Sequence, residues 1–230
     1  MSDTRIYVAL TSEWGNTARK LLEPLAGLPV GVKVGLELFV REGPGIVEEL
    51  RSSGFPVFLD LKFHDIPHTV AGAVRSACAL EPEIINVHAS GGRAMMEAAA
   101  AARTGSTRII AVTVLTSMDS DDLRLLGSTL SPLGAVEALA GAAMGAGLHG
   151  VVCSPLEAAA VRRNTSEDFL IITPGVRPSG SDAGDQKRTM TPAKPSGPAT
   201  ALVVGRPITS APDPAQAAED ILLEIRKALE

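Results

Sequence analysis

The chain has 230 residues, of which 45% are apolar and only 3% aromatic, and its formal net charge is −5. This length is usual for a single α/β barrel, and with so few aromatic side chains Val, Ile, Leu and Ala must build the core. The negative charge and the scattered basic residues argue against nucleic-acid binding, and no apolar run reaches the roughly 20 residues of a membrane span. Because the start also lacks an apolar signal region, we expect a cytoplasmic protein.

Short apolar segments alternate along the chain with longer amphipathic segments. The apolar segments predict strands at Ile6–Leu10, Gly31–Leu36, Val57–Leu61, Ile84–His88, Ile109–Leu115, Gly150–Ser154, Leu170–Thr173 and Ala201–Gly205. The amphipathic segments predict helices at Thr17–Leu25, Gly45–Ser53, Val70–Leu80, Arg93–Arg103, Gly134–Ala146, Pro155–Arg163 and Ala215–Leu229.

Strands that alternate with helices indicate a parallel sheet. Repeats of roughly 25–30 residues favour a closed (β/α)8 TIM barrel, and an open doubly wound sheet is the structural alternative. No linker divides the chain, so we expect residues 1–230 to form one α/β domain. The seventh helix should be short or absent, because Pro192, Pro195 and Pro198 prevent a long one.

The most informative segment is the end of the third strand, where Asp60, Lys62 and Asp65 follow one another closely. Side chains alternate along a strand, so Asp60 and Lys62 should point to the same side. Carboxylates around one ammonium keep it charged and repel a negative charge that a substrate brings between them. A salt-bridged strand end without catalytic function is the simpler interpretation.

Polar residues fall where strands end and loops begin, which is where the active sites of such barrels lie. They are Thr11, Lys33, Asp60, Lys62, Asp65, His88, Thr116, Ser117, the segment Pro174–Arg188, Gly205 and Arg206. The loops after the seventh and eighth strands commonly bind phosphate. Gly175, Gly180, Gly184 and Gly205 allow backbone amides to approach an anion, and Arg206 adds a planar donor group.

Histidine and cysteine spacing predicts no metal site. His64 and His68 are four residues apart, but Pro67 interrupts the segment and no third ligand is evident. Cys78 and Cys153 lie far apart in apolar surroundings, which predicts two reduced, buried thiols.

Several motifs together identify a family. They are Lys33-Val-Gly-Leu-Glu-Leu-Phe39, Phe58-Leu-Asp-Leu-Lys-Phe-His-Asp-Ile-Pro67, Asn86-Val-His-Ala-Ser-Gly-Gly92, Val112-Thr-Val-Leu-Thr-Ser-Met118, Thr173-Pro-Gly-Val-Arg-Pro178, Gly184-Asp-Gln186 and Val204-Gly-Arg-Pro-Ile-Thr209. The Asp-x-Lys-x-x-Asp element alone is shared with related sugar-phosphate lyases. With these motifs, the chain resembles orotidine 5′-phosphate decarboxylases along nearly its whole length.

The resemblance implies decarboxylation of orotidine 5′-monophosphate to uridine 5′-monophosphate, the last step of pyrimidine synthesis, without a cofactor. Lys62 would stabilise the carbanion at ring C6 and then protonate it. The other implied roles are Asp60 and Asp65 holding the lysines, Lys33, Asp65 and Thr69 contacting the ribose, Ser117 binding the pyrimidine, Gln186 bridging base and phosphate, and Gly205 and Arg206 holding the phosphate. Pro174 and Arg177 belong to the loop that would close over the substrate.

The resemblance also implies a homodimer whose active sites lie at the interface. Lys33, Asp60 and Lys62 of one subunit would meet Asp65 and Thr69 of the other. A nucleotide is then the small-molecule partner.

The sequence departs from the family pattern at two places. Thr11 stands where the family usually has an aspartate at the end of the first strand, and a threonine cannot offset the charge of Lys33. The segment Thr191–Ala199 replaces an Ala-rich helix behind the phosphate loop, so we expect a looser phosphate loop. Two alternatives to an active decarboxylase therefore stay open: a weakened homologue that binds nucleotides, and a related sugar-phosphate lyase.

Overall fold

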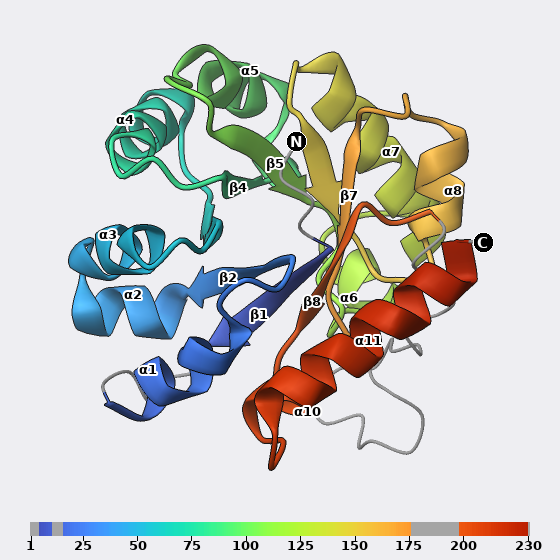
Figure 1. Ribbon diagram of the computed structural model, residues 1–230. Coiled ribbons are helices and arrows are strands. Elements are labelled where there is room, and N and C mark those ends of the chain that lie inside the picture. The colour runs from blue at the N-terminus through green and yellow to red at the C-terminus, as the bar shows by residue number, and fades with distance from the viewer. Residues whose placement is uncertain (1–4, 11–15, 176–197, 230) are drawn as a thin grey trace.

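The strands form a closed barrel. The structure, a computed structural model, describes residues 5–10, 16–175 and 198–229. In that part of the chain each strand pairs in parallel with the next one, and β8 pairs with β1 (Figure 1). The strands are β1 (Ile6–Leu10), β2 (Val30–Gly35), β3 (Val57–Phe63), β4 (Ile84–His88), β5 (Arg108–Val112), β6 (Gly150–Val152), β7 (Leu170–Thr173) and β8 (Ala201–Val204). The prediction of a (β/α)8 TIM barrel is confirmed.

Helices surround the barrel (Figure 1). They are α1 (Asn16–Leu22), η1 (Glu23–Leu25), α2 (Leu36–Glu42), α3 (Gly45–Ser52), α4 (Pro67–Cys78), η2 (Ala89–Gly91), α5 (Arg93–Ala101), α6 (Ser120–Leu125), α7 (Pro132–Gly145), α8 (Ala158–Arg163), α10 (Arg206–Thr209) and α11 (Pro214–Leu229). None of these helices has both the length and the apolar character that a membrane span requires.

Apolar side chains fill the interior of the barrel below the carboxyl ends of the strands. This inner cluster consists of Tyr7, Phe58, Ile84, Ile110, Leu170, Ile172, Ala201 and Val203. Gly31 makes room for the largest of them, because a Cβ there would lie 2.7 Å from two ring carbons of Tyr7. The Tyr7 hydroxyl donates a hydrogen bond of 2.7 Å to Glu83, so the one polar atom of this ring is satisfied. The side chains of this cluster pack against one another inside the barrel, so a site in the barrel lies toward its rim.

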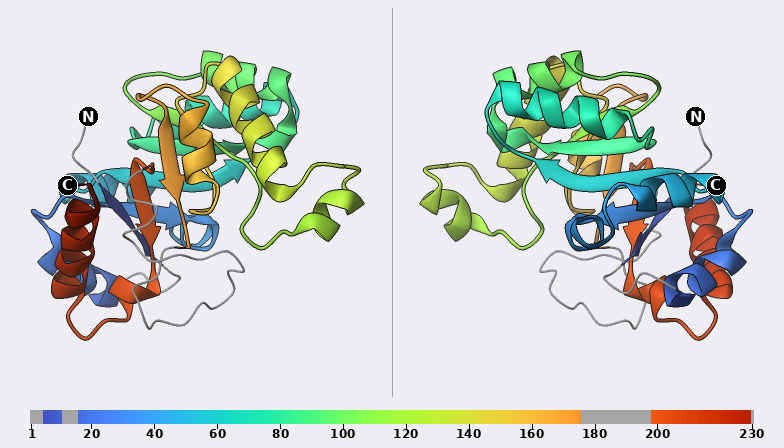
Figure 2. Two further views of the ribbon diagram at one scale, coloured as in Figure 1. Left: turned by 90° about the vertical axis from the view of Figure 1, so that its right-hand side faces the viewer. Right: turned by 90° about the vertical axis from the view of Figure 1, so that its left-hand side faces the viewer.

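Four of these short helices were not predicted from the sequence: α2, η2, α6 and α10. α6 begins with a capping box, in which the Asp119 side chain accepts from the Asp122 backbone and the Asp122 side chain accepts from the Asp119 backbone. The segment that carries α6 stands away from the barrel in both views of Figure 2. The Pro-rich segment Thr191–Ala199, where we expect a weak seventh helix, lies almost wholly outside the described residues.

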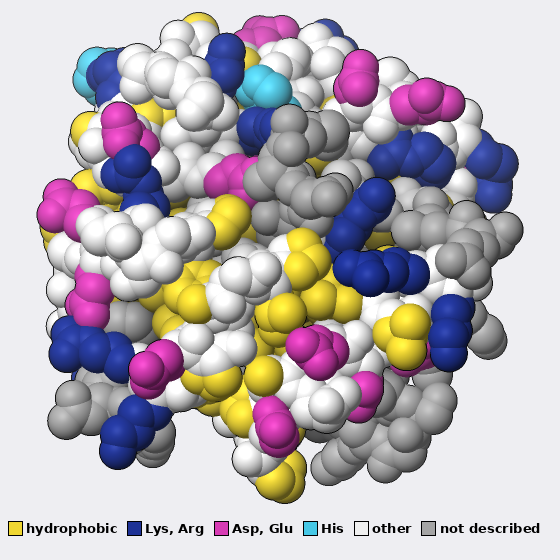
Figure 3. Space-filling model, in the orientation of Figure 1, with side chains coloured by type: hydrophobic (Ala, Val, Ile, Leu, Met, Phe, Trp, Pro, Cys, Tyr) yellow, Lys and Arg dark blue, Asp and Glu magenta, His cyan; other side chains and the backbone are white. Residues whose placement is uncertain are grey.

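The surface shows no large region of one charge on the face drawn in Figure 3, where acidic and basic side chains are interspersed. Any preference for an anionic ligand must therefore come from local groups rather than from the overall charge.

Both cysteines are buried and neither forms a disulfide, as predicted.

Candidate active site

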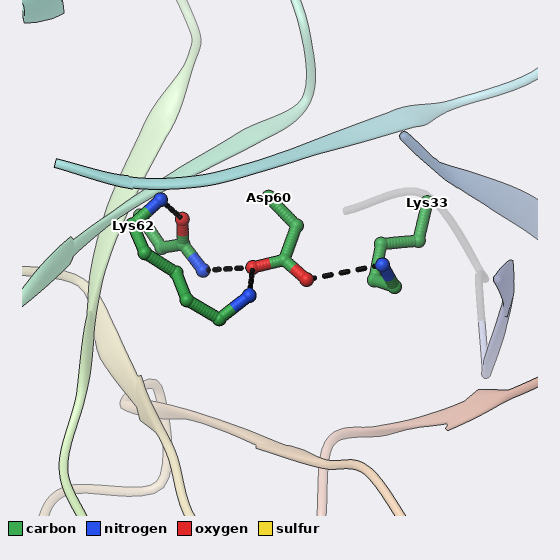
Figure 4. Close-up of polar contacts among 4 residues, drawn as sticks. Lys33, Asp60 and Lys62 are labelled. Carbon is green, nitrogen blue, oxygen red and sulfur yellow. Dashed lines mark hydrogen bonds and ion pairs between the residues drawn. The ribbon is translucent and has the colours of Figure 1, made fainter. Parts of the chain in front are cut away.

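Asp60 lies between two lysines at the carboxyl end of the barrel (Figure 4). Its Oδ2 is 3.0 Å from Lys33 Nζ, and its Oδ1 is 2.6 Å from Lys62 Nζ. Lys33 comes from β2, and Asp60 and Lys62 come from β3. Gly35 at the end of β2 leaves space for the first lysine, since a Cβ there would lie 3.2 Å from Lys33 Nζ. The sequence prediction that these three residues meet agrees with this geometry.

The environment of Asp60 keeps its carboxylate ionised. Burial alone would raise the pKa of this group, because the side chain is only 11% exposed. The charges of Lys33 and Lys62, with hydrogen bonds from Lys62 and Asn86, oppose this effect and lower the pKa from 3.8 to about 2. The site therefore contains a permanent negative charge held by two cations.

Lys62 reaches Asp60 through an irregularity of β3 rather than through the regular alternation expected from the sequence. β3 pairs with β4 at Leu59 and Ile85 and again at Phe63 and Val87, so β3 has two more residues than β4 in this interval. Lys62 sits in this bulge with φ of +53°, a left-handed conformation that is rare for a residue with a side chain. Both side chains serve one site because the strand bulges.

Asn86 on β4 completes the cluster, and the sequence analysis did not identify it as a site residue. Its Nδ2 donates to Asp60 Oδ1 at 2.6 Å, and its Oδ1 accepts from the Lys62 backbone N–H at 2.7 Å. Asn86 is only 1% exposed. The signal in the sequence was a polar residue within an otherwise apolar strand, at the inward parity of Ile84.

A cavity of about 340 Å³ opens beside this cluster. Its charged lining is Lys33, Asp60, Lys62 and Arg206, three cations and one anion, which favours a negatively charged ligand. Its other lining residues are Ala9, Phe58, Val112, Val114, Leu115, Thr116, Val152, Cys153, Pro174, Gly175, Val203 and Gly205. The predicted residues Pro174, Gly205 and Arg206 thus line the same cavity as the lysines.

Three predicted residues lie apart from this cluster within the described chain. Asp65 is exposed, and its Oδ1 accepts from the backbone N–H of Ile66 rather than from a lysine. Thr69 is exposed in the first turn of α4, and Ser117 is exposed in the turn before α6. Among the described residues of one chain, Asp60 is the carboxylate that contacts Lys62.

Two histidines, His64 and His88, lie near Lys62. The rings of His64 and His88 have centroids 5.4 Å apart. Burial, together with the neighbouring His64 and Lys62, lowers the pKa of His88 below its ordinary value of 6.5. In the described ranges, no three His, Cys, Asp or Glu side chains form a group that could hold a metal ion.

The remaining predicted site residues lie outside the described part of the chain. They are Thr11, Arg177 and Gln186.

Comparison with known proteins identifies the family. The model of the orotidine 5′-phosphate decarboxylase / HUMPS family matches residues 4–221. The chain belongs to this family. The resemblance seen in the motifs is thereby confirmed.

Relatives of this family match almost the full chain. The orotidine 5′-phosphate decarboxylase of Chromohalobacter salexigens is 51% identical over 227 residues, covering 97% of this chain and 96% of the relative. That of Halorhodospira halophila is 52% identical over 228 residues, covering 97% of each. The crystal structure of orotidine 5′-phosphate decarboxylase from Lactobacillus acidophilus matches with a TM-score of 0.84 and 37% identity, over 96% of this chain and 99% of that one.

Proposed function

We propose that the protein decarboxylates orotidine 5′-monophosphate to uridine 5′-monophosphate, the last step of pyrimidine synthesis. The observation that carries the proposal is the contact of Lys33 and Lys62 with the same buried carboxylate, that of Asp60. This array faces a cavity that Arg206 also lines, in a chain of the orotidine 5′-phosphate decarboxylase family.

Lys62 is the residue that acts on the reacting carbon. When CO2 leaves, the bond from ring C6 to the carboxylate carbon breaks and its electron pair stays on C6. An ammonium held beside C6 stabilises this carbanion, because its charge is in place before the reaction. The same group then donates a proton to C6, so that hydrogen replaces the lost carboxylate.

Asp60 has two tasks in this mechanism. It holds the ammonium groups of Lys33 and Lys62 in place, and it repels the carboxylate of the bound substrate. Two like charges 4 Å apart repel by about 4 kcal/mol at an effective dielectric constant near 20. This repulsion disappears as the carboxylate becomes neutral CO2, so it opposes the ground state more than the transition state.

Binding of the distant phosphate offsets this repulsion. Arg206 and the Gly205 amide hold the phosphate, with Gln186 between the phosphate and the base. Pro174, Gly175 and Arg177 belong to the loop that closes over the substrate, and Ser117 binds the pyrimidine. Binding energy from these contacts then acts at the reacting ring.

The active unit in this proposal is a homodimer. The segment from His64 to Thr69 is exposed and follows Lys62 closely in the chain, and its Ile66 is 66% exposed. Its carboxylate, Asp65, accepts from the Ile66 backbone N–H and does not contact Lys62. We infer that Asp65 and Thr69 serve the site of the partner subunit, where they contact the ribose. An exposed isoleucine in the segment that directly follows Lys62 and Phe63 fits contact with another subunit.

The test is the fall in orotate-ring absorbance when the protein is added to orotidine 5′-monophosphate in the presence of a chelator, with uridine 5′-monophosphate identified by chromatography. Stoichiometric formation of this product supports the proposal. A strict requirement for Mg²⁺, or trapping of a lysine Schiff base by borohydride with a sugar phosphate, would instead indicate the related lyase chemistry.

Thr11 supports one second candidate, a nucleotide-binding homologue with weakened catalysis. Where the family usually has an aspartate, Thr11 cannot form a charge-assisted hydrogen bond. Such a bond contributes roughly 1.5–3 kcal/mol, so its absence slows catalysis by about tenfold to a hundredfold. Tight binding of uridine 5′-monophosphate without turnover, and turnover gained by Thr11→Asp, would establish this candidate. Full activity with Thr11 in place would exclude it.

A further inference from the structure

Asn86 occupies a position that the proposed mechanism has not used. It lies on β4 between Ile85 and Val87, the residues that pair with β3 on either side of the register shift. Three residues of β3, from Asp60 to Lys62, lie across from this single asparagine. In a regular ladder Leu61 rather than Phe63 would pair with Val87, and Lys62 would lie farther along the barrel axis. The bulge therefore keeps Lys62 close to Asp60.

The amide of Asn86 joins the two ends of this bulge. Its carbonyl oxygen accepts from the Lys62 backbone N–H, where a regular parallel ladder would supply a backbone carbonyl. Its NH2 group donates to Asp60 Oδ1, the same oxygen that contacts Lys62 Nζ. One planar amide thus fixes the backbone of Lys62 and the carboxylate that Lys62 contacts.

Burial makes these bonds hard to replace. At 1% exposure Asn86 is shielded from solvent, so loss of its side chain leaves the Lys62 N–H without its bond. The left-handed backbone of Lys62 is also unfavourable for a residue with a Cβ and persists only when its surroundings hold it. A relaxed backbone at position 62 would redirect the lysine side chain.

We propose that Asn86 is a positioning residue, which holds the bulge of β3 in the conformation that aims the Lys62 ammonium at the reacting carbon. The inference rests on the proposed function for its activity measurement, but the contact itself can be tested without substrate. An amide is required because both a donor and an acceptor are used. Aspartate at this position would keep the acceptor but place a second carboxylate against Asp60.

The experiment compares Asn86→Ala and Asn86→Asp with the control Thr107→Val. Thr107 is also buried, and Thr107→Val removes one hydrogen bond, of 2.7 Å to the Pro82 carbonyl, whereas Asn86→Ala removes two. Thr107 directly precedes β5, at its amino end and away from the site. For Asn86→Ala we expect kcat for orotidine 5′-monophosphate to fall about 10- to 100-fold, with KM changed by less than about threefold. Thr107→Val should keep both constants.

Asn86→Asp provides a pH signature that a purely structural role would not produce. Two adjacent carboxylates share a proton more readily as the pH falls, and that proton restores a donor between them. Its kcat should therefore rise relative to the unaltered protein as the pH is lowered. A parallel pH dependence in the two proteins would contradict the proposal.

Amide hydrogen exchange tests the contact independently of turnover. In Asn86→Ala the Lys62 amide should exchange at least about tenfold faster, while amides of β6 keep their rates. Unchanged Lys62 exchange and wild-type kcat in Asn86→Ala would overturn the proposal, as would an equal loss of kcat in Thr107→Val. If the unaltered protein does not turn over orotidine 5′-monophosphate, the proposed function fails, and the exchange rates still decide the role of Asn86.

Discussion

At the scale of single residues, Asp60 is the group on which the site depends. Its two oxygens contact different lysines, and it is buried. Because its pKa in the folded protein lies near 2, below the ordinary value of 3.8, the ionised form stabilises the folded state. This contribution is fully present above the unfolded value and is lost as the pH falls through the folded value.

Asp60→Asn should remove this pH dependence. The difference in free energy of unfolding between the unaltered protein and the variant should shrink by about 2 kcal/mol as the pH falls from about 5 to about 2. Urea unfolding followed by circular dichroism at several pH values measures it. A difference that stays constant over this range would show that Asp60 is not held ionised by the lysines.

The sequence predicted Lys33, Asp60 and Lys62 because charged residues at the ends of buried strands are conspicuous. It did not predict Asn86, since a single asparagine in an apolar strand has no spacing that marks a partner. It also could not predict the bulge, because the φ of Lys62 results from pairing with β4 rather than from local preference. The residues of the cluster were predictable from residue type and position at strand ends. Their geometry was not, because it depends on tertiary contacts.

At the scale of elements, Arg162 of α8 ties together the start of two strands. Its guanidinium donates to the carbonyls of Ser166, Glu167, Phe169 and Pro198 and to the hydroxyl of Thr200. Burial lowers the pKa of Arg162 below its ordinary value, which is consistent with a guanidinium placed among backbone groups. A planar group with five donors suits this position better than an ammonium.

Arg162→Lys should lower the free energy of unfolding by roughly 1–3 kcal/mol, because a lysine can satisfy only part of these acceptors. Its kcat should not change, since Arg162 does not line the cavity. Denaturant unfolding measures the effect, and Arg163→Lys on the exposed side of the same helix is the control. Equal stability of the two variants would refute the role of Arg162.

The helices that the sequence analysis missed show why element prediction fails locally. α6 follows Asp119, whose capping box with Asp122 is a recognised helix start, but the sequence analysis predicted no helix at this acidic segment. α2 begins directly after Gly35, and its first residue, Leu36, was assigned to the preceding strand. Both helices are short, and short helices give too few periods for a pattern to be distinct.

At the scale of the whole molecule, the barrel was predictable because eight strand–helix repeats allow few topologies. The homodimer is an expectation from the family resemblance, because the fold of one chain does not identify which exposed residues meet a partner. The proposed dimer makes a specific prediction for Lys62→Ala and Asp65→Ala. Each variant alone should be inactive, but a heterodimer of the two would contain one complete site, with Lys62 from one chain and Asp65 from the other.

Mixing the two variants after dissociation should therefore restore about one quarter of the wild-type activity, because half of randomly formed dimers are heterodimers with one intact site of two. The orotidine 5′-monophosphate assay measures the recovery, and each variant mixed with itself is the control. If Asp65 serves its own chain, no mixture recovers activity.

The measurement that tests the central claim most directly is the decarboxylation rate of Lys62→Ala beside that of Lys20→Ala, an exposed lysine on α1. If the Lys62 ammonium stabilises and protonates the C6 carbanion, its loss should reduce kcat for orotidine 5′-monophosphate by at least about a thousandfold. Lys20→Ala should retain full activity. A Lys62→Ala variant that keeps more than about one tenth of the wild-type kcat would contradict the mechanism.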